Sequence, residues 1–281
     1  MINIVDAHHH VWSLARGDYG WLTPGHAPIY RDFSLDDYAR AAPQVATSVL
    51  VQAAPTFAET QYLLDIARAS HGRVGGVVGW VELDDDNAPA RLADAARDPL
   101  LKSVRPMLQD LDDPEWILQP RVMQALAAMP ALGLRFDALV RPVHLLALAR
   151  MVEAHSGLDV VIDHAAKPDI AAGEWEPWAS AMRDLALHPR VYCKLSGLVT
   201  EAGPEWSVDM LSPYVDHVLG LFGTGRVLWG SDWPVVELNG GYDRWWQATS
   251  RLLEPLDDAS RAAILGGNAT RFYRLAPDNP L

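Results

Sequence analysis

Three consecutive histidines lie near the start of the chain, one residue after the short apolar segment Ile2–Asp6. This segment predicts a buried strand, and alternate residues of an extended strand point to the same face. His8 and His10 therefore share one face, and His9 points to the other. Two imidazoles on one face can hold a divalent metal or transfer a proton. A pair of hydrogen-bonded structural histidines fits the same pattern, so later residues must decide.

The same chemistry is offered by His164, which follows the apolar segment Asp159–Asp163, and by Asp232, which lies in the run Gly230–Pro234. Three imidazoles and a carboxylate suit Zn²⁺ or a similar divalent ion with one position open for water. Zinc lowers the pKa of its bound water to about 7, which supplies a nucleophile at neutral pH. Without metal, Asp232 could itself take a proton from water while histidines polarise the electrophile.

Other polar residues are candidates for binding a substrate. Gln52 and Arg105 end two predicted strands and could bind a carbonyl or hydroxyl oxygen, although Arg105 could instead form an ion pair at the rim. Lys167 follows the His164 segment and is a further candidate, with a solvated or structural lysine as the alternative. Trp12 opens a long aromatic connection over residues 11–34, which predicts a lid over the substrate or a loop packed on the rim.

Strands and helices must alternate to place these residues together. Eight short segments, mostly continuous apolar runs, are typical of strands buried on both faces: Ile2–Asp6, Thr47–Val51, Gly76–Val81, Lys102–Arg105, Leu134–Leu139, Asp159–Asp163, Val191–Leu195 and Arg226–Gly230. Helical patterns lie between and after them, at Thr56–Ala67, Arg91–Arg97, Pro120–Met129, His144–Glu153, Trp175–Leu187, Trp206–Leu221, Tyr242–Leu253, Asp258–Leu265 and Asn268–Leu275.

This alternation predicts a single (β/α)₈ barrel over residues 1–281, with a long aromatic first βα loop and C-terminal helices. An open doubly wound sheet is the alternative, but the Gly-x-Gly-x-x-Gly turn of its dinucleotide-binding version does not follow the first strand. In such a barrel the site forms at the carboxyl ends of the strands. Lys194, on the seventh strand, is as well suited to an ion pair inside the barrel as to substrate contact.

Composition narrows the functional classes. The 281 residues carry a net charge of −13 without a basic stretch, which argues against nucleic acid and against a polybasic membrane surface. The single cysteine, Cys193, allows no intrachain disulfide and fits a reducing compartment. We expect no signal peptide and no membrane span. These features predict a cytoplasmic protein that acts on a small molecule, with a homo-oligomer possible.

Five separated motifs resemble the amidohydrolase superfamily, and within it the sugar-lactonase-like subgroup that includes the L-fuconolactonases: Asp6–Trp12, Asp163–Pro168, Lys194–Gly197, Trp229–Pro234 and Gly267–Tyr273. The resemblance implies that His8, His10, His164 and Asp232 hold one divalent metal, zinc first, and that Asp232 activates water, with His164 as its catalytic partner. The predicted fifth and seventh strands lack the modified lysine and the extra histidine of two-metal members. One metal or none is therefore expected, because some members of the subgroup work without metal.

The resemblance further implies hydrolysis of a sugar lactone, L-fuconolactone or a similar aldonolactone, to the hydroxy acid. Arg105 stands nearly alone as a cation, so a neutral polyhydroxylated lactone is favoured over a dicarboxylate. The alternatives are a pyrone-dicarboxylate lactonase, a metal-dependent decarboxylase of the same superfamily, and a non-catalytic sugar-binding barrel. The last of these has no need for an aspartate beside three histidines.

Overall fold

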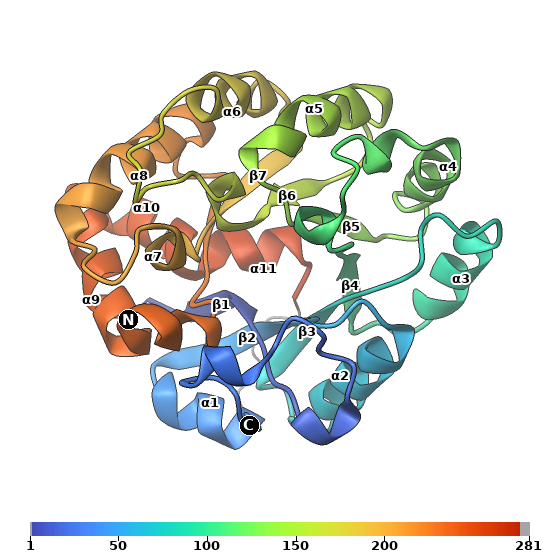
Figure 1. Cartoon of the computed structure of the whole chain (residues 1–281), viewed down its shortest axis with the longest axis horizontal. Helices are drawn as coiled ribbons and strands as arrows, with labels where there is room; N and C mark the ends of the chain where they lie inside the picture. The colour runs from blue at the N-terminus through green and yellow to red at the C-terminus, as the bar shows by residue number, and fades with distance from the viewer. Residues whose placement is uncertain (1, 276–281) are drawn as a thin grey trace.

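The computed structural model describes residues 2–275 and shows eight parallel strands, paired in chain order, with helices around them (Figure 1). The arrangement confirms the predicted (β/α)₈ barrel over the open sheet. The first strand reaches His9, beyond the predicted end at Asp6, so His8 lies inside the strand instead of after it. The strands are β1 Ile4–His9, β2 Val45–Val51, β3 Val74–Gly79, β4 Leu101–Val104, β5 Arg135–Ala138, β6 Val160–Ile162, β7 Val191–Leu195 and β8 Val227–Trp229.

The outer helices are α1 Leu35–Ala41, α2 Phe57–Ala69, α3 Ala88–Ala95, α4 Pro120–Ala128, α5 Leu145–Ala154, α6 Trp178–Ala186, α7 Leu198–Glu201, α8 Val208–Phe222, α9 Gly241–Leu252, α10 Asp258–Ala262 and α11 Asn268–Phe272. Helices α1 and α7 were not predicted. Helix α1 begins at a capping box in which the Ser34 hydroxyl accepts a hydrogen bond from the Asp37 backbone N–H at 3.1 Å. Within residues 2–275, no helix is long and apolar enough to span a membrane.

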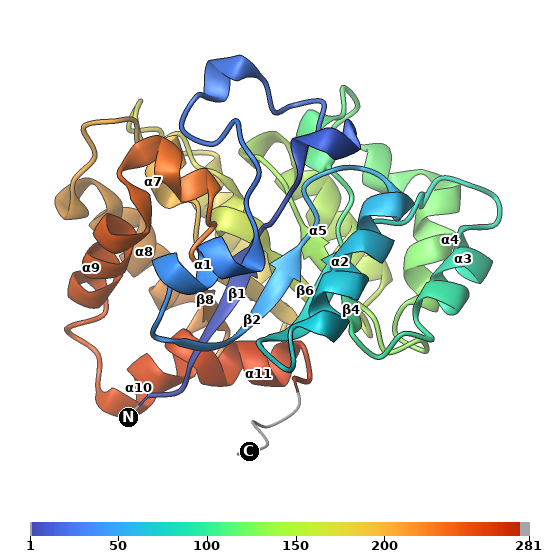
Figure 2. The ribbon, with the colours of Figure 1, turned by 90° about the horizontal axis from the view of Figure 1, so that it is seen from below.

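The barrel closes where β1 meets the residues that follow β8. The backbone N–H of Asp232 donates to the carbonyl of His8 at 2.8 Å, and that of His10 donates to the carbonyl of Trp233 at 2.7 Å. Figure 2 shows the long first loop above one end of the barrel and α10 and α11 at the other end. The closing seam therefore runs up to the end where the predicted site residues gather.

Charged side chains fill part of the barrel interior. Arg105, Asp137, Asp163 and Lys194 are each at most 3% exposed and lie among apolar strand residues. The ammonium of Lys194 lies 2.6 Å from Asp137 Oδ2 and 2.9 Å from Asp163 Oδ1. Of the two possibilities for this lysine, the structure shows the ion pair inside the barrel. The main apolar core lies between the strands and the outer helices.

Candidate active site

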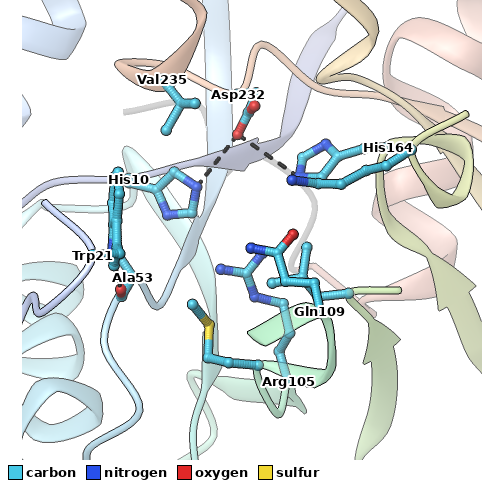
Figure 3. A pocket seen from close by; sticks show the side chains of 11 residues that line it. His10, Trp21, Ala53, Arg105, Gln109, His164, Asp232 and Val235 are labelled. Carbon is cyan, nitrogen blue, oxygen red and sulfur yellow. Dashed lines mark hydrogen bonds and ion pairs between the residues drawn. The ribbon is translucent and has the colours of Figure 1, made fainter. Parts of the chain in front are cut away.

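Asp232 and the three histidines converge near the carboxyl ends of the strands. Figure 3 shows the Asp232 carboxylate directed toward His10 and His164. The Oδ1 atom of Asp232 lies 3.4 Å from His10 Nε2, 3.6 Å from His8 Nε2 and 3.9 Å from His164 Nε2. The Nε2 atoms of His8 and His10 are 3.2 Å apart. The first strand and the segment after the last strand thus supply most of the cluster, as the alternation of side chains along β1 predicts.

A buried carboxylate, Asp6, fixes these two segments against each other. Its Oδ1 accepts the backbone N–H of His8 at 3.0 Å and that of Ser231 at 2.9 Å, and its Oδ2 accepts the Tyr38 hydroxyl at 2.7 Å. Burial raises the pKa of Asp6 to about 6, although these hydrogen bonds oppose the rise. The Asp6 carboxylate therefore fixes the position of His8 relative to the loop that carries Asp232.

His164 is presented by an unusual turn. Residues 164–167 all have positive φ, between 50° and 61°, so the chain makes a left-handed turn built without glycine. The ring Nδ1 of His164 lies 2.9 Å from the Ser196 hydroxyl, which fixes the imidazole plane. A Cβ atom at Gly197 would lie 2.4 Å from that same nitrogen. The Ser196-Gly197 pair of the motif therefore orients His164 and leaves room for it.

Arg105 directly follows β4 and is held by its neighbours. It donates to Asp163 Oδ2 at 3.2 Å and to the side chain of Gln52 at 3.3 Å, while the Gln52 amide donates back to the Arg105 carbonyl at 2.7 Å. Gln52 is fully buried, so the structure places it as a support for Arg105 and away from the cavity. Arg105 itself reaches the cavity wall.

The cluster borders a cavity of about 160 Å³ that is lined by both polar and apolar residues. The polar residues are His10, Arg105, Gln109, His164, Lys167 and Asp232, and the apolar ones are Trp21, Ala53, Met107, Leu139 and Val235. Lys167 also lies 3.6 Å from Glu201. His8 is fully buried behind this wall.

The aromatic of the first loop that faces the cavity is Trp21, whose indole N–H donates to the Ala53 carbonyl at 2.7 Å. Trp12, predicted as a substrate contact, is 1% exposed and donates to the Arg31 carbonyl instead. Gln109 was not predicted as a site residue. It lies in a short 3-10 helix, Leu108–Asp110, that comes after β4, so the pattern of strand ends does not point to it. Its Oε1 makes no hydrogen bond within the described chain.

Three of the clustered side chains fit a divalent cation. Zinc ligands lie about 2.1 Å from the ion, so the ligand atoms of a tetrahedral site are roughly 3.4 Å apart. The separations of 3.2 to 3.6 Å among His8 Nε2, His10 Nε2 and Asp232 Oδ1 match this spacing, and His164 Nε2 lies 3.9 Å from Asp232 Oδ1. His8, His10 and Asp232 form one group that could hold a metal, and His8, Asp163 and His164 form another.

The electrostatics favour the protonation states that a metal site needs, which are neutral imidazoles and an ionised carboxylate. Burial lowers the pKa of His164 to about 4 and holds the pKa of His8 well below its usual value, so both rings are neutral at neutral pH. Burial alone would raise the pKa of Asp232, but the neighbouring His164 and the hydrogen bond from His10 hold it well below its usual value. Asp232 is therefore a carboxylate beside neutral imidazoles. Burial also raises the pKa of the Cys193 thiol, which leaves that residue inert.

The fold and the site together define a barrel hydrolase with a histidine and aspartate cluster at the carboxyl ends of its strands. The amidohydrolase family profile matches residues 5–275. The chain therefore belongs to the amidohydrolase family, as its five motifs predicted.

Two similar proteins are both named L-fucono-1,5-lactonase. The one from Burkholderia ambifaria is 48% identical over 280 residues, which cover 96% of this chain and 95% of the relative. The one from Burkholderia multivorans is 33% identical and covers 96% of each chain. A crystal structure of an amidohydrolase from Burkholderia multivorans with bound zinc superposes with a TM-score of 0.91 at 32% identity, over 98% of this chain and all of that one.

Proposed function

We propose that the protein hydrolyses the ring ester of a sugar lactone, L-fucono-1,5-lactone or a similar aldonolactone, with Asp232 as the base that activates water. The observation that carries the proposal is the position of the Asp232 carboxylate, within 3.9 Å of three imidazole nitrogens and on the wall of the cavity. The similarity to two L-fucono-1,5-lactonases supports the lactonase class that the sequence predicted.

The cavity suits one neutral sugar ring. Its volume of about 160 Å³ lies below that of pockets for drug-sized ligands, which begin near 300 Å³. Among the described residues, the cations on its wall are Arg105 and Lys167, and Lys167 already faces Glu201. These two side chains therefore leave too little free positive charge on the wall to favour a dicarboxylate substrate. Trp21 offers an aromatic surface for a sugar face.

The chain's own residues account for the proton transfers. Asp232 accepts a proton as water attacks the lactone carbonyl, and Arg105 stabilises the charge that develops on the carbonyl oxygen. Ring opening expels an alkoxide, which takes from Asp232 the proton that Asp232 accepted from water. A divalent cation, held by His8, His10, His164 and Asp232, would polarise the carbonyl and lower the pKa of water. We propose zinc for this position because a similar structure contains it.

A panel of sugar lactones tests the proposal through the acid that each hydrolysis releases, measured with and without chelator. We expect turnover of L-fucono-1,5-lactone and a loss in Asp232→Asn of about 10²-fold to 10⁴-fold, the usual contribution of a general base. Asp36→Asn is the matched control, because its side chain is 77% exposed and does not line the cavity. Near-normal turnover by Asp232→Asn would show that Asp232 is not the base that activates water. Release of carbon dioxide instead of acid would favour the decarboxylase.

A further inference from the structure

Arg105 and Lys167 both line the cavity, but the two cations are held with different strength. Arg105 is 3% exposed, and its guanidinium contacts Asp163 at 3.2 Å as well as the backbone carbonyl and the side chain of Gln52. Among the described residues, Lys167 is held by one ion pair, in which its Nζ lies 3.6 Å from Glu201 Oε1. This distance is too long for a hydrogen bond. Lys167 is therefore the cation of the wall that can exchange its partner.

The partner of Lys167 belongs to a second pocket beside the first. Lys167 lines both pockets, whereas Glu201, the last residue of α7, lines the second one, which has a volume of about 390 Å³. Asp169 and Glu174 line this second pocket as well, so its carboxylates outnumber its cations, Arg141 and Lys167. The negative charge attracts the Lys167 ammonium toward the second pocket and away from the cavity that borders Asp232.

The proposed reaction changes the charge of the molecule in the cavity. An aldonolactone is neutral, and the addition of one water across its ring ester gives a hydroxy acid. The carboxyl group of this acid is ionised at neutral pH, because carboxyl groups have pKa values near about 4. The carboxylate forms at the carbon that water attacks, inside the cavity that Lys167 lines. An unpaired ammonium on this wall would therefore bind the product more tightly than the substrate.

We propose that Glu201 is a positioning residue that competes with the product carboxylate for Lys167, so that the site releases the acid that it forms. The inference rests on the proposed function, because it requires a neutral lactone to become an anion. Glu201 and the product carboxylate compete for one ammonium group, and the other carboxylates of the second pocket add to the attraction of Glu201. The ion pair lowers the affinity for the product and leaves the affinity for the neutral ring unchanged.

Inhibition by the product tests this role. The inhibitor is the sodium salt of the acid, prepared by complete alkaline hydrolysis of L-fucono-1,5-lactone. We expect Glu201→Gln to lower the inhibition constant of this acid about tenfold, because Lys167 loses its partner, and to change KM for the lactone less than about twofold. Glu174→Gln is the matched control, because it removes the same charge from the same pocket and forms no ion pair with Lys167 in the described chain. Its inhibition constant should stay near that of the wild type.

A double-mutant cycle assigns the effect to Lys167. Lys167→Met leaves Glu201 without its cation and should raise the inhibition constant several-fold. In this background, Glu201→Gln should change the inhibition constant no more than Glu174→Gln does. If Lys167→Met fails to fold, the comparison between Glu201→Gln and Glu174→Gln still decides the question.

An inhibition constant in Glu201→Gln equal to that of the wild type would overturn the inference, and so would equal decreases in Glu201→Gln and Glu174→Gln. Parallel changes in KM and in the inhibition constant would show a purely structural role and would also overturn it. A wild type that hydrolyses the lactone, combined with any of these results, leaves the proposed function standing. A wild type that hydrolyses no lactone would overturn the proposed function and this inference together.

Discussion

The left-handed turn that presents His164 gives a quantitative prediction for Ala166. This residue has φ +61° and is fully buried in the turn. Left-handed backbone costs an L-residue about 1–2 kcal/mol relative to the usual helical region, and glycine avoids this strain. We therefore expect Ala166→Gly to change stability much less than a buried alanine-to-glycine substitution normally does.

The opposing contributions can be estimated. Ala166→Gly gains about 1–2 kcal/mol from relief of strain. It loses about 0.4–1 kcal/mol to the larger entropy of the unfolded chain and about 0.8 kcal/mol from the buried methyl group. The net change in the free energy of unfolding is close to zero, within about 1 kcal/mol. Ala125→Gly is the matched control in helix α4, equally buried, and should lose about 2 kcal/mol.

Urea unfolding of the wild type and both variants, followed by circular dichroism, measures the difference. We expect Ala125→Gly to shift the midpoint clearly downward and Ala166→Gly to stay near the wild type with an unchanged slope. Equal losses in the two variants would show that the turn is not strained, and the reasoning from φ would be refuted.

Three further predictions concern other parts of the site and its surroundings. Asp137→Ala leaves the ammonium of Lys194 short of a partner inside the barrel, and should cost about 3–5 kcal/mol in urea unfolding, against less than 1 kcal/mol for Asp36→Asn at the surface. Burial raises the pKa of Glu59 from 4.5 to about 7, so the folded protein favours the protonated Glu59 carboxyl. The stability that this protonation adds to the fold is complete below pH 4.5 and is lost as the pH rises to 7, and Glu59→Gln should flatten the pH profile of the free energy of unfolding across that window. Gln109→Leu removes a polar group from the cavity wall, and should lower kcat/KM for a polyhydroxylated lactone about tenfold.

The sequence predicted the strand order and the convergence of the main cluster because both follow from periodicity. A side chain at every second position of β1 must share a face, and parallel strands must end at one rim. Residues outside the strands that line or support the site follow no such periodic pattern, so the sequence does not predict them. Gln109 lies beyond the end of β4, and the capping box before α1 uses Asp37 where Glu or Gln is the usual third residue.

Hydrogen bonds to partners far along the chain explain the remaining differences between sequence and structure. Gln52 and Trp12 lie where the predicted rim requires them, yet hydrogen bonds to Arg105 and to the Arg31 carbonyl turn both side chains away from the cavity. Which of two neighbouring aromatics faces a cavity depends on partners far along the chain. A cytoplasmic location and a homo-oligomeric state stay predictions.

Closure of the barrel and assembly of the site depend on the same contacts. The backbone hydrogen bond from Asp232 to His8 joins the last strand to the first, and it also brings the Asp232 carboxylate within reach of His10. Asp6 reinforces this seam by accepting from both sides of it. A chain whose first strand slipped by one residue would turn His8 and His10 to the outer face and lose the site with the seam. The fold therefore cannot close correctly without also bringing the base to the histidines.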